Sequence, residues 1–514
     1  MLIKEAKPFY FRHARYLQKQ LKMGLPPVGL TFEDVLVLPK HSNIPSRKDD
    51  SLNLKSHIAG DVYTNLPIIT ANMDTITEWQ MSQEIALLGG VGVIHRYLTS
   101  EEQARQVKIV KDKTRTFQDQ PFSVHPDTTV RDMRNLKKKQ KTGYFLVQDT
   151  DNNLLGIITD RDLDSTDDDS TQGHLIMTPS DRLITVPEGT TLEEAEKVMK
   201  IKRIQKVPVL SSEGRVVGVF TQKDAQIARK FPNASKDNKG KLIVGAAVGV
   251  KDIEAEVERT YKLVEAGVDF IIIDIAHGDS ENMMKMLRRL AKDRNINVPI
   301  IAGNIATGEA AKVLIGEGAD GLKVGIGPGW ACDTRIVAGV GRAQISAIAS
   351  VAAVAVSNKI TVIADGGMRN PGDLVKALIA GADIGMFGGM FAGTLETPGK
   401  LITKGKKKFK RYDGMASNSA RIRARNSHQI IQTSGIYEDR YSDTEVDAEQ
   451  DAPEGREKEV PLRGPVREVV VYLEGGLRSG MSYVNAHTIS EIRKKGTFER
   501  ITQAGANEQY GEVS

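Results

Sequence analysis

Cys332 is the only cysteine in the 514 residues of the chain, so any thiol chemistry falls on this one side chain. It stands in the segment GIGPGWACDTRIVAGVG, residues 325–341. Glycines allow the backbone of such a loop to approach a ligand closely, and a thiolate there can attack an electrophilic carbon. A lone cysteine is more often an inert small hydrophobic residue, but the glycine-rich loop favours a nucleophile. A single cysteine excludes an intrachain disulfide and a metal site built from several thiolates.

Two glycine pairs follow other apolar runs. Gly366 and Gly367 come after Asp365, and Gly388 and Gly389 come after IGMF. Backbone N–H groups in such turns can hold a phosphate, and the Asp365 carboxylate can accept hydrogen bonds from ribose hydroxyls. Each pair alone could be a simple tight turn, but the two together favour a phosphate site.

Eight short apolar runs alternate with amphipathic stretches that end in glycine, a pattern typical of parallel strand–helix units. The runs are LPIITA at Leu66, GGVGVIH at Gly89, LIVGAAVG at Leu242, VDFIIID at Val268, PIIAGN at Pro299, GLKVGIG at Gly321, ITVIADGG at Ile360 and IGMFGG at Ile384. Eight units predict an α/β fold, a (β/α)₈ TIM barrel. Because such barrels place their active sites at the carboxyl ends of the strands, Cys332 and both glycine pairs should meet at one mouth.

The long gap between the second and third runs predicts an inserted domain. It contains two half-repeats that end in LLGIITDRD and VVGVFTQKD, and these resemble a tandem pair of CBS modules. We therefore expect residues 1–114 to begin the barrel, 115–232 to form the CBS pair and 233–514 to complete the barrel. In CBS modules, residues matching Thr159, Asp162, Thr221 and Asp224 often hold an adenine or guanine nucleotide. The alternative is that Thr159 and Thr221 merely end strands.

Charge and hydropathy exclude several classes of protein. The net charge of +5 is small and scattered, which predicts no nucleic-acid partner. The basic run KGKKKFKR at residues 404–411 is either a polyanion patch or, as we prefer, a solvated hairpin arm. No signal peptide or membrane span is evident, so we expect a cytoplasmic protein without a membrane partner. An acidic, turn-rich segment at residues 435–459 predicts a surface loop, within a mobile flap at about 413–460.

The motifs and their order resemble the inosine monophosphate dehydrogenase and guanosine monophosphate reductase family. The resemblance covers nearly the whole chain. Its motifs are LTFEDVLVLP at Leu30, NMDTITE at Asn72, GVIHR at Gly92, DIAHG at Asp274, AGN at Ala302, the Cys332 loop, ADGG, and YDGMAS at Tyr412.

This resemblance implies a reaction. Cys332 would add to C2 of inosine monophosphate (IMP), hydride would pass to NAD, and water would hydrolyse the thioimidate to xanthosine monophosphate, in purine and GMP biosynthesis. Thr334 would help to position the water. Arg440 and Tyr441 would activate it, an unusual task for an arginine, whose unperturbed pKa exceeds 12.

The resemblance also implies binding residues and partners. Substrate contacts would be Asp365, Gly366, Gly367, Gly388, Gly389, Tyr412, Gly414, Met415 and Glu454. Asp274 and Asn304, with Gly325 and Gly327 near them, would form the NAD side. A monovalent cation, usually K⁺, would bind carbonyls of Gly325, Gly327 and Cys332, with Glu508 donated by a neighbouring subunit. A homotetramer follows, with octamers possible through the CBS pair.

The flap favours the dehydrogenase over the reductase, which is one of two alternatives. DRY at Asp439 and PEG at Pro453 resemble the dehydrogenase flap, whereas an NADPH-dependent reductase, which converts GMP to IMP and ammonia, generally lacks the arginine–tyrosine pair. The other alternative is a nucleotide-sensing scaffold with weak catalysis. The chain departs from the family pattern at a few positions. Trp330 replaces a phosphate-contacting serine, Ala331 and Asp333 replace other residues, Asn72 and Gly389 look more like the reductase, and Ala416 replaces a glycine.

Overall fold

The computed structural model of this chain describes residues 8–24, 26–114, 121–140, 142–424 and 452–508. Its contacts divide the chain into two compact units. One unit comprises Met1–Lys113, Asn233–Asp237 and Leu242–Ser514, and the other comprises Thr114–Pro232 and Asn238–Lys241. We refer to them as the barrel unit and the inserted unit.

The barrel unit is built on an eight-stranded parallel sheet, in which each strand corresponds to one of the eight apolar runs. The strands are β4 (Ile68–Thr70), β5 (Gly92–Ile94), β13 (Val244–Val248), β14 (Phe270–Asp274), β15 (Ile300–Ile305), β16 (Gly321–Val324), β17 (Thr361–Asp365) and β18 (Ile384–Phe387). Hydrogen bonds between Val91 and the backbone of Ile68 and Thr70 join the first strand to the second. The predicted (β/α)₈ barrel with an inserted module is therefore confirmed.

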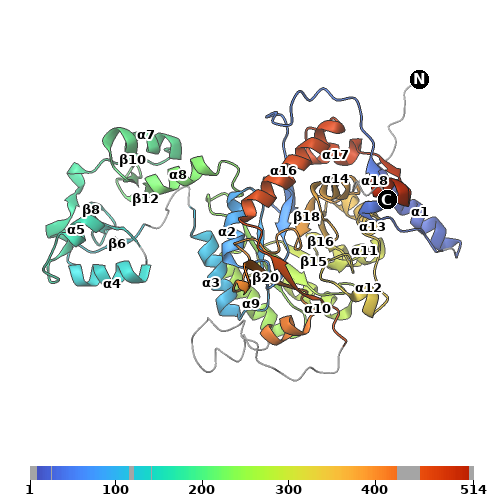
Figure 1. The fold of residues 1–514 in the computed structure, drawn as a ribbon. Helices are drawn as coiled ribbons and strands as arrows, with labels where there is room; N and C mark the ends of the chain where they lie inside the picture. The colour runs from blue at the N-terminus through green and yellow to red at the C-terminus, as the bar shows by residue number, and fades with distance from the viewer. Residues whose placement is uncertain (1–7, 25, 115–120, 141, 425–451, 509–514) are drawn as a thin grey trace. The chain divides into compact units, whose positions relative to one another are not determined.

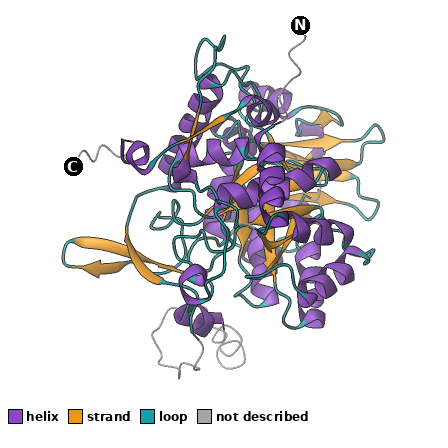
Figure 2. Cartoon of the chain, turned by 90° about the vertical axis from the view of Figure 1, so that its right-hand side faces the viewer, coloured by secondary structure: helices purple, strands orange, loops and turns teal. Residues whose placement is uncertain are grey.

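A helix follows each strand and packs on the outside of the sheet (Figures 1 and 2). These helices are α2 (Trp79–Leu87), α3 (Ser100–Lys111), α9 (Ile253–Glu265), α10 (Glu281–Ala291), α11 (Gly308–Gly316), α13 (Gln344–Ala355), α14 (Pro371–Ile379) and α16 (Val466–Tyr483). Several begin at a side-chain cap predicted by residue type. Thr99, Asp252, Thr307 and Asn370 each accept a hydrogen bond from the first turn of the following helix.

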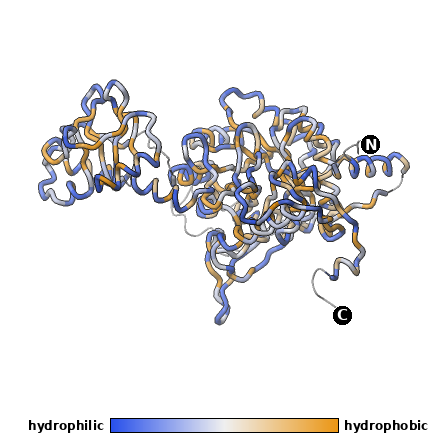
Figure 3. Tube along the Cα trace, turned by 90° about the horizontal axis from the view of Figure 1, so that it is seen from above, coloured by the Kyte–Doolittle hydropathy of each residue, from blue (hydrophilic) through white to orange (hydrophobic). Residues whose placement is uncertain are grey.

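The interior of the barrel is a packed apolar core, and hydrophobic segments fill the inside of each unit (Figure 3). Ile69, Val93, Phe270, Ile301 and Ile363 are among its fully buried side chains. A filled interior makes the barrel a packed core without a channel, and barrel enzymes place their active sites at the carboxyl-end mouth.

Smaller elements complete the barrel unit. The elements that precede β4 in the sequence are α1 (Phe9–Lys22), η1 (Phe32–Asp34), β1 (Val35–Val37), β2 (Ser56–Ala59) and β3 (Val62–Thr64). The elements that follow α16 in the sequence are α17 (Ile489–Lys495), β22 (Phe498–Arg500) and α18 (Gln503–Glu508). The basic run forms the hairpin of β19 (Ile402–Lys404) and β20 (Lys407–Asp413), and β21 (Glu457–Pro461) pairs antiparallel with β20.

The inserted unit repeats one pattern twice. The first half contains β6 (Ser123–Val124), α4 (Val130–Gln140), β7 (Tyr144–Gln148), β8 (Leu154–Thr159) and α5 (Asp160–Asp164). The second contains β10 (Val186–Pro187), α7 (Leu192–Lys202), β11 (Lys206–Leu210), β12 (Val216–Thr221) and α8 (Gln222–Lys230). The connecting elements are α6 (Gly173–Ile176), β9 (Thr178–Pro179) and η2 (Ser180–Arg182). Each half has its own apolar cluster, and a third cluster combines Leu146 and Ile157 from one half with Val219 from the other.

Within the described ranges, no helix is long and apolar enough to cross a membrane.

Candidate active site

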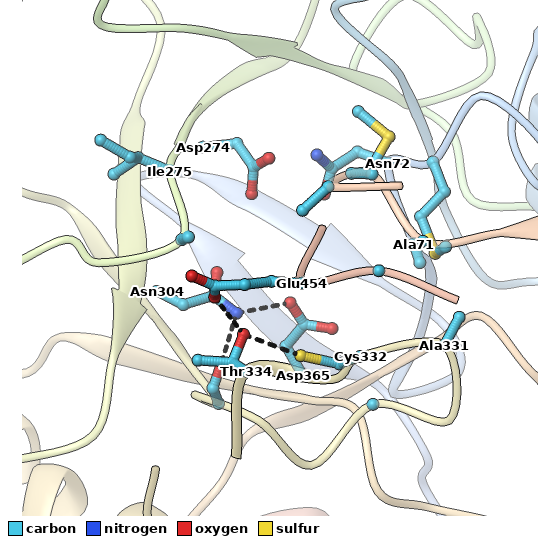
Figure 4. A pocket seen from close by; sticks show the side chains of 18 of the residues that line it. Ala71, Asn72, Asp274, Ile275, Asn304, Ala331, Cys332, Thr334, Asp365 and Glu454 are labelled. Atoms are coloured by element: carbon cyan, nitrogen blue, oxygen red, sulfur yellow. Dashed lines mark hydrogen bonds between the residues drawn. The ribbon is translucent and has the colours of Figure 1, made fainter. Parts of the chain in front are cut away.

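A pocket of about 420 Å³ lies at the carboxyl ends of the barrel strands (Figure 4). Its size suits a small-molecule ligand. Among the residues that line it are Asn72, Arg96, Asp274, Asn304, Lys323, Gly325, Gly327, Cys332, Thr334, Asp365, Tyr412, Gly414, Met415 and Glu454. The predicted nucleophile, Asp365 and most of the implied substrate and cofactor residues therefore share one cavity.

The Cys332 loop connects β16 to α12 (Thr334–Val337) and is held by two close backbone approaches. A Cβ built on Gly325 would lie 2.1 Å from the carbonyl oxygen of Asp365, and one built on Gly414 would lie 2.3 Å from that of Ala331. No side chain fits at either position without backbone movement. The glycines thus bring the loop against β17 on one side and against the 414–416 segment on the other.

The segment 454–456 pairs with the Cys332 loop like a short antiparallel strand. Cys332 and Gly455 form an isolated β-bridge, and the Asp333 N–H donates to the Glu454 carbonyl at 2.7 Å. The Arg456 N–H donates to the Ala331 carbonyl at 3.0 Å, and its guanidinium forms an ion pair with Asp333. This pairing brings Glu454 beside the thiol although 122 positions of sequence separate Glu454 from Cys332.

Three side chains then form a hydrogen-bonded chain (Figure 4). The Cys332 thiol donates to the Thr334 hydroxyl at 3.2 Å, and that hydroxyl donates to Glu454 Oε2 at 2.7 Å. A hydroxyl that accepts from a thiol and donates to a carboxylate can pass the thiol proton to that carboxylate. The geometry is that of a nucleophile with a base one step away.

Lys323 is a site residue that the sequence reasoning did not select. It lies on β16, 2% exposed, and its ammonium contacts Asp274 Oδ1 at 2.7 Å and Asp365 Oδ2 at 2.9 Å. Burial alone would lower the pKa of Lys323, but the two carboxylates outweigh it and the pKa is raised. Lysine within an apolar strand was the available signal, because a cation is almost never buried without a partner.

The same cation also acts on the pKa of Asp274. Burial raises the pKa of Asp274, but Lys323 and Arg96 outweigh it, so the pKa is lowered overall. The Asn304 amide donates to Asp365 Oδ2 at 2.9 Å and to the Gly325 carbonyl at 2.7 Å. The expected ribose residue Asp365 and the expected cofactor residues Asp274 and Asn304 are thus joined in one network.

The glycine pairs lie where the sequence predicts them, at the ends of β17 and β18. A Cβ on Gly366 would lie 3.2 Å from the backbone nitrogen of Gly329, which shows that the first pair packs on the Cys332 loop. One on Gly388 would lie 3.2 Å from the Tyr412 hydroxyl. Burial, then Asp365 and Cys332, raises the pKa of Tyr412, so the phenol stays neutral and can donate a hydrogen bond.

Tyr97 is a second residue that the sequence reasoning missed. It follows the GVIHR motif and lines the pocket, and its hydroxyl donates to the Met415 carbonyl at 2.7 Å. Burial raises the pKa of Tyr97. A neutral phenol therefore holds the backbone of the residue expected to meet the base.

The structure brings together some of the residues implied for the cation site, but not all of them. Gly325, Gly327 and Cys332 offer loop carbonyls, hard oxygen donors suited to a monovalent cation. The Gly325 carbonyl already accepts a hydrogen bond from Asn304, so it would share its second lone pair. Glu508 lies in α18, which contacts η1 of the same chain, and it does not line the pocket. Among the described residues, no group of three or more His, Cys, Asp or Glu side chains could hold a metal.

Other predicted residues lie elsewhere. Arg440 and Tyr441 are outside the described residues. In the inserted unit, the Thr159 hydroxyl and N–H both donate to Asp162 at 2.7 Å, and the Thr221 hydroxyl donates to Asp224 at 2.5 Å. Each pair caps the helix that follows its strand. Thr159 and Thr221 therefore have a local role at the ends of their strands, as in the alternative that the sequence left open.

Fold and site define a class: a (β/α)₈-barrel enzyme with a hydrogen-bonded cysteine in a small-molecule pocket. A family model described as the IMP dehydrogenase / GMP reductase domain matches residues 29–511. The inosine-5'-monophosphate dehydrogenase of Aquifex aeolicus is 42% identical over 94% of this chain and 95% of its own length. That of Nitrosopumilus maritimus is 40% identical over 93% and 96%.

Solved structures are similar as well. A cysteine-to-alanine variant of GMP reductase from Trypanosoma brucei, in complex with guanosine 5'-monophosphate, has a TM-score of 0.80 at 39% identity, covering 95% of this chain and 98% of its own. The same reductase in complex with guanosine 5'-triphosphate has a TM-score of 0.71 at 36% identity, covering 94% and 100%. The chain belongs to the IMP dehydrogenase/GMP reductase family and is an oxidoreductase.

Proposed function

We propose that the barrel unit oxidises IMP to xanthosine monophosphate with NAD, the reaction named by the curated relatives. The observation that carries the proposal is the Cys332–Thr334–Glu454 chain at the barrel mouth. It supplies a nucleophile and a proton acceptor in one place.

The network around Lys323 supports the binding of a ribonucleotide. Asp365, which forms an ion pair with Lys323, is a suitable acceptor for ribose hydroxyls. The turns after β17 and β18, the seventh and eighth strands of the barrel, are where such barrels commonly bind a phosphate. With the ribose and phosphate fixed there, the base would extend toward Cys332 and toward the Met415 carbonyl that Tyr97 holds.

In the proposed reaction, the Cys332 sulfur bonds to C2 of the hypoxanthine ring and its proton passes through Thr334 to Glu454. NAD supplies the acceptor for the hydride that leaves C2. Water then adds to C2, the C–S bond breaks, and the thiol regains a proton. Thr334 and Glu454 are also near enough to the sulfur to orient that water, while Arg440 and Tyr441 are the proposed water-activating pair.

Asp274 and Asn304 are the proposed contacts on the nicotinamide side. Both line the pocket, and contact with Lys323 fixes the orientation of their polar groups toward the cavity. K⁺ is proposed on the carbonyls of Gly325, Gly327 and Cys332, where it would stiffen the loop that carries the nucleophile.

We also propose a homotetramer in which Glu508 of one subunit reaches the cation site of the next. Ile336, Val337 and Val340 follow the Cys332 loop and are 71%, 44% and 57% exposed. An exposed apolar strip of this kind supports a subunit contact there. Regulation by adenine or guanine nucleotides at the Thr159–Asp162 and Thr221–Asp224 pairs, with octamers through the inserted unit, completes the proposal.

The second candidate is the reduction of GMP to IMP and ammonia with NADPH. The similarity to solved GMP reductases favours it, and the Cys332–Thr334–Glu454 chain could equally protonate a departing amine. Asn72, one of the reductase-like residues, lines the pocket and donates to Asp274.

The absorbance of reduced nicotinamide separates the candidates. Purified protein with IMP, NAD and K⁺ should produce a rise in absorbance. A fall with GMP and NADPH, without a rise with IMP, would replace the proposed reaction with the reductase reaction. No change in either mixture would favour the scaffold alternative.

A further inference from the structure

Trp330 fills the space beside the second glycine pair. A Cβ built on Gly389 would lie 3.2 Å from Cε3 of the indole, and the ring stacks on Tyr412 with centroids 5.4 Å apart at 29°. The indole is 45% exposed, so it forms the wall of this corner without being buried in it. It brings no hydroxyl to the turns that are proposed to hold the phosphate.

A cation lies on this wall. The Lys458 ammonium is 4.1 Å from the centroid of the Trp330 ring, within the range of a cation–π contact. Lys458 is on β21 directly opposite Tyr412 on β20, so both side chains project from the same face of this antiparallel strand pair. Trp330, Tyr412 and Lys458 form a unit that we call the indole wall.

Lys458 differs from the neighbouring Arg456 and Arg463 in the partners of its charged group. Burial, followed by the charge of Arg456, lowers its pKa, and the Asp333 carboxylate opposes this only partly. Asp333 is itself paired with Arg456, and Arg463 donates to the carbonyls of Gly389 and Met390 at 3.4 and 3.3 Å. Within the described residues, the Lys458 ammonium forms no hydrogen bond or ion pair within 4 Å and rests on the ring face, which leaves its three N–H donors for a ligand.

We propose that Lys458, held on the face of Trp330, binds the 5'-phosphate of the nucleotide with its charged ammonium, in place of a hydroxyl, which Trp330 does not have. Charge-assisted hydrogen bonds are among the strongest in proteins, so hydrogen bonds from the ammonium to a phosphate dianion more than offset the free energy lost when it leaves the ring face. Its four-carbon stem permits the short movement. The inference rests on the proposed function only in that the ligand is a nucleoside monophosphate.

The test is equilibrium binding of IMP, GMP, inosine and guanosine to the full chain. Lys458→Met should weaken IMP and GMP on the order of 10- to 100-fold, the range for a hydrogen bond to a charged group. Binding of the two nucleosides should be unchanged. Lys458→Arg, which keeps the charge and the ring contact, should stay within about threefold of the wild type.

Two variants provide the controls. Lys404→Met removes a lysine on β19 of the same three-stranded sheet, where it is paired with Glu459, and it should not alter binding. Trp330→Leu, which removes the ring face but no charge, should weaken the monophosphates less than Lys458→Met does.

The outcomes distinguish this inference from the proposed function. Equal affinity of wild type and Lys458→Met for IMP and GMP overturns the role of Lys458 and leaves the proposed function intact. An equal loss for nucleosides and nucleotides also overturns it, since the effect would then be structural. If the wild type binds neither IMP nor GMP, this inference and the proposed function fall together.

Discussion

The two units use the same kinds of polar residue in opposite ways. In the inserted unit, the two members of each Thr–Asp pair are three residues apart, and they hydrogen-bond to each other within one turn of backbone. In the barrel unit, the partners come from distant strands: Lys323 on β16 binds Asp274 on β14 and Asp365 on β17. A local pair stabilises one helix terminus, whereas a distributed network depends on the whole fold. Removing one member should therefore cost far more in the barrel unit.

The largest effect should come from the nucleophile. Cys332→Ala removes the atom that is proposed to bond to C2, so turnover should fall by about 10³-fold or more. Steady-state kinetics measure the loss, and nucleotide binding with an unchanged melting profile shows that the fold persists. Turnover close to that of the wild type would refute the covalent step.

The distributed network is tested by Lys323→Met. It leaves two partly buried carboxylates without the Lys323 ammonium, so the free energy of unfolding should fall by about 3–5 kcal/mol, with loss of activity. The matched control Lys262→Met breaks the exposed pair with Glu101, and it should cost less than about 1 kcal/mol. Denaturant titration compares the two. A similar small cost for both would show that the buried network contributes no more to stability than an exposed ion pair.

Acid should act on the barrel unit through His13. Burial, followed by the charge of Arg342, lowers the pKa of His13 from 6.5 to about 4. Between these values the unfolded chain binds more protons than the folded one, so stability is full above about pH 6.5 and falls as the pH drops toward 4, by up to about 3 kcal/mol.

Thermal melts from pH 7 to pH 4.5 measure this slope. His13→Gln should flatten it, whereas the control His174→Gln in the inserted unit should not. An unchanged slope in His13→Gln would assign the acid sensitivity to other groups.

The smallest effects are expected at the caps. Thr191 caps α7 with Glu194, and Thr159 caps α5 with Asp162. Thr191→Ala and Thr159→Ala should each cost the inserted unit about 1 kcal/mol. If the Thr–Asp pairs also bind nucleotides, only Thr159→Ala should weaken the binding of ATP or GTP. Equal binding by both variants would leave Thr159 with the cap alone.

The sequence was sufficient for features that repeat or that act locally. The eight apolar runs predicted the eight barrel strands, and the position of the glycine-rich segment after the sixth run predicted that Cys332 lies at the barrel mouth. The cytoplasmic location, the tetramer and the roles of the site residues stay predictions.

Distributed contacts were beyond the sequence. The pairing of residues 454–456 with the Cys332 loop joins segments without a shared periodicity, so no pattern in either one announces it. Lys323 was missed for a related reason. Its partners are close only because β14, β15, β16 and β17 are neighbours in the closed sheet.

The position of Lys323 also bears on how the barrel chooses its strand alignment. Side chains alternate between the two faces of a strand, so a shift of β16 by one residue would turn Lys323 outward, into the helix layer. Asp274 and Asp365 would then remain inside without the Lys323 ammonium, at a cost of several kcal/mol. The observed register, with Lys323 opposite Gly303 on one side and Ile363 on the other, is the one in which the three charges meet. The ion pairs of the pocket thus make misaligned barrels unfavourable during folding, before any ligand is bound.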